Sequence, residues 1–203
     1  MGLTIANQLT IVRMGMIPLL ITLILSNHPA WALLVFILAG LTDALDGIIA
    51  RHYEQSSELG AFLDPMADKL LMTALFIVLS IPDHPQSLPE FQAANHLPVY
   101  LTIVTISRDV FIVMISLVIH LATGYVGFKP TSLGKATTVI QVVTVGTVLL
   151  CNSLDRPSPI IISGLVWLTL AMTLSSGLHY IHHATRLAGS ASREEKDAAR
   201  EGD

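Results

Sequence analysis

The segment Leu41–Leu70, LTDALDGIIARHYEQSSELGAFLDPMADKL, places four aspartates at the edges of two strongly apolar stretches. The acids are Asp43, Asp46, Asp64 and Asp68. The whole chain of 203 residues is 52% hydrophobic and only 13% charged, with a mean hydropathy of +0.66. A soluble domain carries about 25% charged residues, so the composition indicates lipid as the surrounding solvent. A chain that favours lipid therefore keeps four carboxylates where two of its apolar segments end.

Apolar stretches continue on both sides of this segment. A helix needs about 20 mostly apolar residues to span a bilayer. We therefore predict an all-α integral membrane protein with six transmembrane helices, at residues 9–26, 31–50, 61–82, 97–122, 133–153 and 159–183. Residues 1–187 would form one membrane domain. The charged segment 188–203 is expected to be a flexible cytoplasmic tail, either a frayed helix or disordered.

The basic residues indicate the orientation, because cytoplasmic loops are enriched in Lys and Arg. Of eleven basic residues, only Arg156 lies in the loops that join the first and second, third and fourth, and fifth and sixth spans. Both termini and the aspartates are therefore predicted on the cytoplasmic side, in a multi-pass protein of a bacterial plasma membrane. The net charge of −4 gives no indication of a nucleic-acid partner.

The spacing of the four aspartates predicts that they converge. Asp43 and Asp46 are three residues apart on one predicted helix, and Asp64 and Asp68 are four apart on the next, so each pair shares a helix face. Clustered carboxylates repel one another and are costly near lipid, by about 3 kcal/mol each at the bilayer centre. Hard divalent cations, which prefer oxygen ligands, are the natural partners. Two such ions could hold a diphosphate and stabilise charge during its cleavage.

The same segment resembles the signature of the CDP-alcohol phosphatidyltransferase family. That signature is D-x-x-D-G-x-x-A-R, then eight residues, then G-x-x-x-D-x-x-x-D, and this chain matches each fixed position: Asp43, Asp46, Gly47, Ala50, Arg51, Gly60, Asp64 and Asp68. The family's six-span fold agrees with the predicted spans. The resemblance implies transfer of a phosphatidyl group from CDP-diacylglycerol to an alcohol, with release of CMP.

The resemblance also implies roles for individual residues. The four aspartates would ligate two Mg²⁺ or Mn²⁺ ions, and Asp68 would act as the general base for the acceptor hydroxyl. The cytidine diphosphate would be bound by Gly47, Ala50, Arg51 and Gly60, together with Asn7 and Thr10 of the N-x-x-T-x-x-R segment near the start. Arg13 of that segment is equally consistent with an interfacial anchor. The family commonly forms homodimers, so a second copy is an expected partner.

Weaker sequence motifs indicate which alcohol is the acceptor. FLDPMADK resembles the branch that acts on glycerol-type acceptors, either phosphatidylglycerol, which gives cardiolipin, or glycerol 3-phosphate. Within that branch, ISRDV resembles the type that forms cardiolipin. We expect Arg108 and Lys135 to hold the acceptor's phosphate, although Arg108 could form a buried ion pair and Lys135 could extend to the membrane boundary. Ser116 stands where the glycerol 3-phosphate enzymes often have a second arginine. We therefore favour phosphatidylglycerol, with glycerol 3-phosphate as the alternative.

Two other classes of function are weighed against this prediction. A cation transporter needs polar groups near the midplane of several helices, whereas these acids gather at one end. A structural scaffold gives no reason for four converging carboxylates. The segment HYIHH at 179–183 offers histidines at metal-binding offsets, but no other ligands accompany them, and a membrane-boundary role is favoured.

Overall fold

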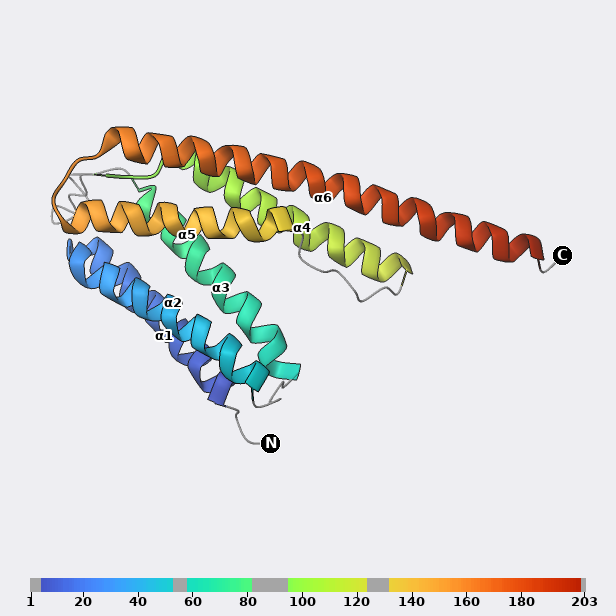
Figure 1. Ribbon diagram of the computed structural model, residues 1–203, viewed down its shortest axis with the longest axis horizontal. Helices are drawn as coiled ribbons and strands as arrows, with labels where there is room; N and C mark the ends of the chain where they lie inside the picture. The colour runs from blue at the N-terminus through green and yellow to red at the C-terminus, as the bar shows by residue number, and fades with distance from the viewer. Residues whose placement is uncertain (1–4, 53–57, 82–94, 124–131, 202–203) are drawn as a thin grey trace.

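The computed structural model describes the backbone of residues 5–52, 58–81, 95–123 and 132–201, and the side chains of residues 8–43, 66–81, 95–115 and 132–181. Within these residues the chain is all-helical, as predicted, with six helices and no strand (Figure 1). They are α1 (Ile5–Leu25), α2 (Pro29–His52), α3 (Glu58–Leu79), α4 (Val99–Thr123), α5 (Ser132–Ser153) and α6 (Pro159–Glu201).

Two tight turns join α1 to α2 and α5 to α6, and they use the same chemistry. Asn27 and Asp155 adopt positive φ angles of 55° and 48°, in the left-handed region that Asn and Asp tolerate better than most residues. In each turn the next amide donates to a carbonyl five residues back, from His28 to Leu23 at 2.9 Å and from Arg156 to Cys151 at 3.0 Å. This hydrogen bond satisfies a carbonyl at the helix end. A proline then begins the following helix, where its missing N–H costs nothing.

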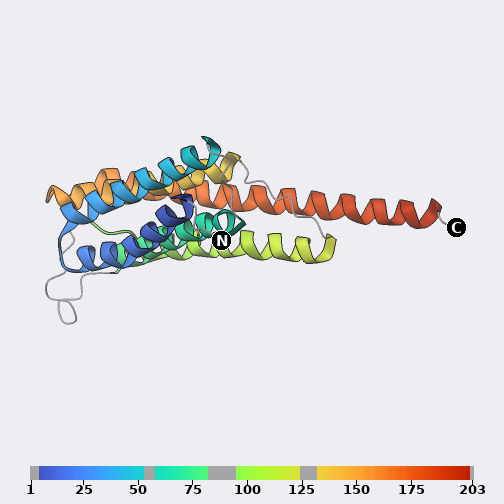
Figure 2. The same cartoon turned by 90° about the horizontal axis from the view of Figure 1, so that it is seen from below.

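The helices form two connected groups. α1 packs against α2 and α3, and α6 packs against α4 and α5, while α2 also contacts α5. The turns after α1 and α5 lie at one end of the bundle, and α6 extends beyond the other helices at the opposite end (Figures 1 and 2). The core between the groups is aliphatic and aromatic, and its fully buried members include Leu20, Phe76, Leu101, Val145 and Val148.

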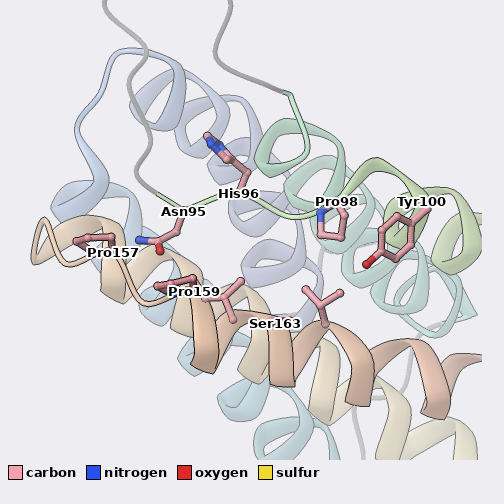
Figure 3. A pocket seen from close by; sticks show the side chains of 9 residues that line it. Asn95, His96, Pro98, Tyr100, Pro157, Pro159 and Ser163 are labelled. Carbon is pink, nitrogen blue, oxygen red and sulfur yellow. The ribbon is translucent and has the colours of Figure 1, made fainter.

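A buried amide pair fastens the end of the bundle where these turns lie. The Asn95 backbone N–H and side-chain Nδ2 both donate to Asn152 Oδ1 at 3.0 Å, and Asn152 Nδ2 donates to the Asn95 carbonyl at 3.0 Å. Asn95 also accepts from the Ser158 N–H at 3.0 Å and donates to the Arg156 carbonyl at 3.1 Å. In Figure 3, Asn95 and His96 project to opposite sides of the segment that precedes α4. This pair ties that segment to the end of α5 and to the α5–α6 turn.

The outer surface of the bundle is apolar. Large hydrophobic side chains are exposed along several helices, including Trp31 at 61%, Phe111 at 63% and Trp167 at 62%. Three helical segments within the described residues are long and apolar enough to cross a membrane: Gln8–Leu25, Ser132–Ser153 and Pro159–Ile181. The other three predicted spans include residues whose side chains are not described. These apolar helices fit a membrane protein.

The predicted spans coincide closely with the helices, apart from the end of the chain. α6 continues from Pro159 to Glu201, well past the predicted end of the last span at residue 183. Its backbone therefore includes residues 188–201, part of the expected tail. The division of the chain at residue 187 stays a prediction.

Candidate active site

A cavity of about 600 Å³ lies between α2, α3 and α5. Asp43 of α2, Asp68 of α3 and Lys135 of α5 contribute charged groups to its lining. Around them the walls are largely apolar and include Phe36, Ile37, Ala39, Leu71, Met72, Val139 and Val142. The cavity therefore brings together two of the predicted metal ligands and one predicted acceptor-binding residue, from helices far apart in the sequence.

Arg13 of α1 holds one of these acids in place. Its Nη1 lies 2.7 Å from Asp43 Oδ1, and the Arg13 side chain is fully buried, whereas 49% of the Asp43 side chain is exposed. Thr10, one helical turn earlier, is fully buried too. Residues three apart share a helix face, so Thr10 and Arg13 present one polar patch of α1 to the interior. The alternative that Arg13 is an interfacial anchor is wrong, because the side chain lies inside the bundle.

The other predicted ligands are placed only as positions on helices. Asn7 lies in α1; Asp46, Gly47, Ala50 and Arg51 lie in α2; and Gly60 and Asp64 lie in α3. Their side chains lie outside those that the structure describes. Because α2 and α3 are continuous helices, Asp46 follows Asp43 by three residues and Asp64 precedes Asp68 by four on the same helix. The helical spacing used for the prediction is thus present in the backbone.

Arg108 is held away from this cavity. Its Nη1 donates to Asp109 Oδ1 at 2.7 Å, and its Nη2 donates to Ser176 Oγ of α6 at 2.6 Å. The second oxygen of Asp109 accepts from Lys69 Nζ of α3 at 2.7 Å. One carboxylate therefore joins two cations, and the chain of contacts links α3, α4 and α6. The structure pairs Arg108 with an acid and does not place it among the residues that line the α2–α3–α5 cavity.

The donor set of the cavity fits a divalent metal. Asp43 and Asp68 offer carboxylate oxygens, the ligands that Mg²⁺ and Mn²⁺ prefer. Asp68 is partly buried and Asp43 is half-exposed, so both are accessible from the cavity. Among the described side chains no three acidic, histidine or cysteine groups lie close enough to bind a metal. Two of the four predicted ligands, Asp46 and Asp64, fall outside those side chains.

The comparison with known families agrees with this chemistry. The family model described as CDP-alcohol phosphatidyltransferase matches residues 3–175. The chain belongs to this family. The match covers all six helices up to the middle of α6, and it confirms the family expected from the aspartate pattern at residues 43–68.

Curated relatives in this phosphatidyltransferase family carry two kinds of name. The human cardiolipin synthase (CMP-forming) is 33% identical over 199 residues, which cover 90% of this chain and 62% of that protein. A probable phosphatidylglycerophosphate synthase from Mycobacterium tuberculosis is 31% identical over 196 residues, covering 91% of this chain and 83% of that protein. A putative cardiolipin synthase from the same species is 32% identical over 149 residues, or 73% of this chain and 65% of that protein. The chain spans about three fifths of the length of the human and rat relatives, at 62% of each.

Sequence reasoning missed three features of the site. It left the partner of Arg13 open, and it did not pair Lys69 with Asp109 or Arg108 with Ser176. The sequence shows an arginine in α1 and an acid in α2, but whether their side chains touch depends on how the two helices are rotated. The i, i+3 spacing of Thr10 and Arg13 was the one available signal that both face inward.

Proposed function

We propose that this protein transfers a phosphatidyl group from CDP-diacylglycerol to the hydroxyl of a glycerol-type acceptor, with release of CMP. The observation that carries the proposal is the cavity in which Asp43, Asp68 and Lys135 meet. Family membership supports the reaction class, and it disfavours the cation transporter considered from the sequence. Phosphatidylglycerol is the favoured acceptor, which makes cardiolipin the product.

Asp68 is the proposed general base. Its carboxylate lines the cavity and takes the proton of the acceptor hydroxyl. The hydroxyl oxygen attacks the phosphorus of the phosphatidyl group, and the bond from that phosphorus to the CMP oxygen breaks. CMP leaves with the bonding electrons, so no covalent enzyme intermediate is required. Arg13 fixes the orientation of the neighbouring Asp43 through its 2.7 Å ion pair.

Asp43, Asp46, Asp64 and Asp68 are proposed to hold two Mg²⁺ or Mn²⁺ ions. When bound, such ions supply positive charge that neutralises the diphosphate and the leaving CMP. Thr10, whose side chain is buried beside that of Arg13 on α1, is proposed to bind the CDP group together with Asn7, Gly47, Ala50, Arg51 and Gly60. Without side chains, the two glycines of this set allow the ligand to approach the backbone closely.

The charge of the cavity supports phosphatidylglycerol as the acceptor. Lys135 is the one basic side chain among the described residues that line it. Glycerol 3-phosphate carries a phosphomonoester dianion, which is best held by more than one cationic group. The phosphodiester of phosphatidylglycerol carries a single negative charge, which Lys135 alone matches. The name of the Mycobacterium relative that shares 31% identity supports glycerol 3-phosphate as the second candidate.

The proposed membrane arrangement has six spans with both termini in the cytoplasm of a bacterial cell. The apolar outer surface and the excess of basic residues at one end support it. The active site would then face the cytoplasm. A homodimer and a tail that begins at residue 188 complete this proposal.

A reconstituted assay tests the function and the acceptor together. The purified protein is placed in liposomes with labelled CDP-diacylglycerol and Mg²⁺, and phosphatidylglycerol and glycerol 3-phosphate are offered together. We expect CMP and cardiolipin in equal amounts, separated by thin-layer chromatography. Phosphatidylglycerophosphate without cardiolipin would show that the acceptor is wrong and the reaction class right. Absence of CMP release with either acceptor would contradict the proposed function.

A further inference from the structure

Lys69 follows directly after Asp68, the proposed general base, so the sequence puts a cation beside the aspartate site. A lysine ammonium is carried on a flexible stem of four carbons and can reach carboxylates in several directions. An ammonium in the α2–α3–α5 cavity would neutralise the negative charge that the proposed Mg²⁺ or Mn²⁺ ions require. Asp68 lines that cavity, whereas Lys69 is not among the described residues that do. The ammonium is bound elsewhere.

The carboxylate of Asp109 on α4 binds the Lys69 ammonium. Lys69 Nζ donates to Asp109 Oδ2 at 2.7 Å, the length of a charge-assisted hydrogen bond. Successive residues of a helix point in directions about 100° apart, so Asp68 and Lys69 leave α3 on different sides. Asp109 therefore receives the lysine on a side of α3 that differs from the side of Asp68.

Asp109 is itself held in a fixed direction. Its Oδ1 accepts from Arg108 Nη1 at 2.7 Å, and Arg108 Nη2 donates to Ser176 Oγ of α6 at 2.6 Å. Ser176 is fully buried, and only 9% of the Arg108 side chain and 17% of the Asp109 side chain are exposed. Both oxygens of the Asp109 carboxylate are therefore occupied, and a buried chain of contacts from α6 sets the point at which Lys69 is bound.

The Lys69–Asp109 ion pair should add little to stability. The Lys69 side chain is 48% exposed, and such pairs gain little because water screens the charges and the long side chain loses freedom. Arg108 would still balance the charge of Asp109 if Lys69 were absent. The location of the ammonium matters more, because the interaction of two charges falls with their separation. The pair determines how much positive charge reaches the neighbouring aspartates.

We propose that Asp109 is a positioning residue that holds the Lys69 ammonium out of the α2–α3–α5 cavity. The negative charge of the cavity thereby stays available to divalent cations. Asp109 contacts neither the metal nor the substrate in this proposal and acts only through Lys69. The inference rests on the proposed function for the metal site, and it adds a residue of α4 that preserves the charge of that site.

Direct binding of Mn²⁺ tests the proposal without turnover. The full chain in detergent micelles is titrated with Mn²⁺, and the unbound ion is measured by its electron paramagnetic resonance signal. Asp109→Asn keeps the shape and one acceptor oxygen for Arg108, but its amide nitrogen cannot accept from Lys69. The affinity for Mn²⁺ should fall by about tenfold or more, because the released ammonium pairs with a cavity carboxylate. An unchanged affinity would overturn the proposal.

A second substitution distinguishes this role from a role in helix packing. In the double variant Asp109→Asn/Lys69→Met no ammonium is released, so the affinity for Mn²⁺ should return to that of the unaltered chain. A loss caused by separation of α3 from α4 would persist, and such persistence would overturn the proposal. Asp155→Asn is the matched control, because it removes an aspartate from the α5–α6 turn at the other end of the bundle. An equal loss of affinity in this control would also overturn it.

Lys69→Met alone gives an independent measurement. It replaces a half-exposed side chain and leaves Asp109 paired with Arg108, so the fold is not at risk. The affinity for Mn²⁺ should change much less than in Asp109→Asn, because Asp109 already binds the ammonium. A rise of about tenfold would show that Lys69 neutralises the aspartates in the unaltered chain, and would overturn the proposal.

The outcomes separate this inference from the proposed function. Mn²⁺ binding that Asp109→Asn does not weaken would overturn the inference and leave the function intact. Weakened binding that Lys69→Met restores, in a preparation that makes no cardiolipin, would support the role of Asp109 and contradict the function. Absence of Mn²⁺ binding by the unaltered chain would overturn the inference together with the proposed metal site.

Discussion

Arg13 of α1 and Asp43 of α2 form an ion pair of 2.7 Å in which the arginine side chain is fully buried and the carboxylate is 49% exposed. The two partners therefore depend on each other unequally. Asp43 keeps contact with water without Arg13, whereas the Arg13 guanidinium is shielded from water, so the negative charge of Asp43 matters more to it. Because of this asymmetry, the contribution of the ion pair to stability can be measured apart from its contribution to activity.

Substitutions of the two partners should therefore differ in stability. Asp43→Asn replaces one charged partner of the buried Arg13 guanidinium by a neutral amide and should lower the free energy of unfolding by about 1–3 kcal/mol, the cost of losing a charged hydrogen bond. Arg13→Met replaces the buried charge with an apolar side chain of similar length and should cost less. Thermal unfolding in detergent measures both, and turnover should fall in both variants. A larger loss of stability for Arg13→Met would contradict the asymmetry.

Activity should depend on a divalent cation. Removal of metal with excess chelator should abolish CMP release, and Mg²⁺ or Mn²⁺ should restore it, because the clustered carboxylates need positive charge to bind a diphosphate. Asp64→Asn should have the same effect while the protein still inserts into membranes. Asp155→Asn is the matched control, since Asp155 lies in the α5–α6 turn at the other end of the bundle and Asn tolerates its φ of 48°. Full activity in chelator would exclude the metal site.

The role of Asp68 as general base should be separable from substrate binding. Asp68→Asn removes the proton acceptor but keeps the shape of the side chain, and turnover should fall by about 10²–10⁴-fold. The affinity for CDP-diacylglycerol, measured by equilibrium binding of labelled substrate, should change far less. Near-normal turnover in this variant would remove Asp68 from the mechanism, and a parallel loss of affinity would assign it to substrate binding alone.

The Asn95–Asn152 amide pair, at the end of the bundle opposite the aspartates, should contribute to stability and not to activity. Asn152→Leu removes the present partner of the Asn95 carbonyl and backbone N–H, while Asn95 Nδ2 keeps the Arg156 carbonyl, and each buried unsatisfied group costs about 1–3 kcal/mol. The unfolding temperature should drop, while turnover per folded molecule stays unchanged. Ser153→Ala provides the control, because among the described residues the Ser153 hydroxyl bonds to the Leu150 carbonyl of its own helix and to no other group. Loss of turnover in the folded variant would indicate that the two ends of the bundle are coupled.

The sequence alone predicted the elements of this fold. Apolar length set the six helices, since a helix of about 20 residues is the form in which an apolar chain satisfies its backbone in lipid. The prolines that begin α2 and α6 and the Asn and Asp of the preceding turns are local signals of the same kind. The spacing of Asp43, Asp46, Asp64 and Asp68 also depends only on helix geometry, and the fixed pattern around them identified the family.

The tertiary structure decided which side chains meet. Spacing fixes the face of a helix that a residue occupies, but the partner of that face depends on how neighbouring helices rotate and cross. Lys135 of α5 therefore lines one cavity with Asp43 and Asp68, whereas Arg108, its predicted companion, pairs with Asp109 and Ser176. The ion pair of Arg13 with Asp43 of the next helix depends on packing in the same way. Packing between helices, which no single segment encodes, decided which of these charged side chains are in contact.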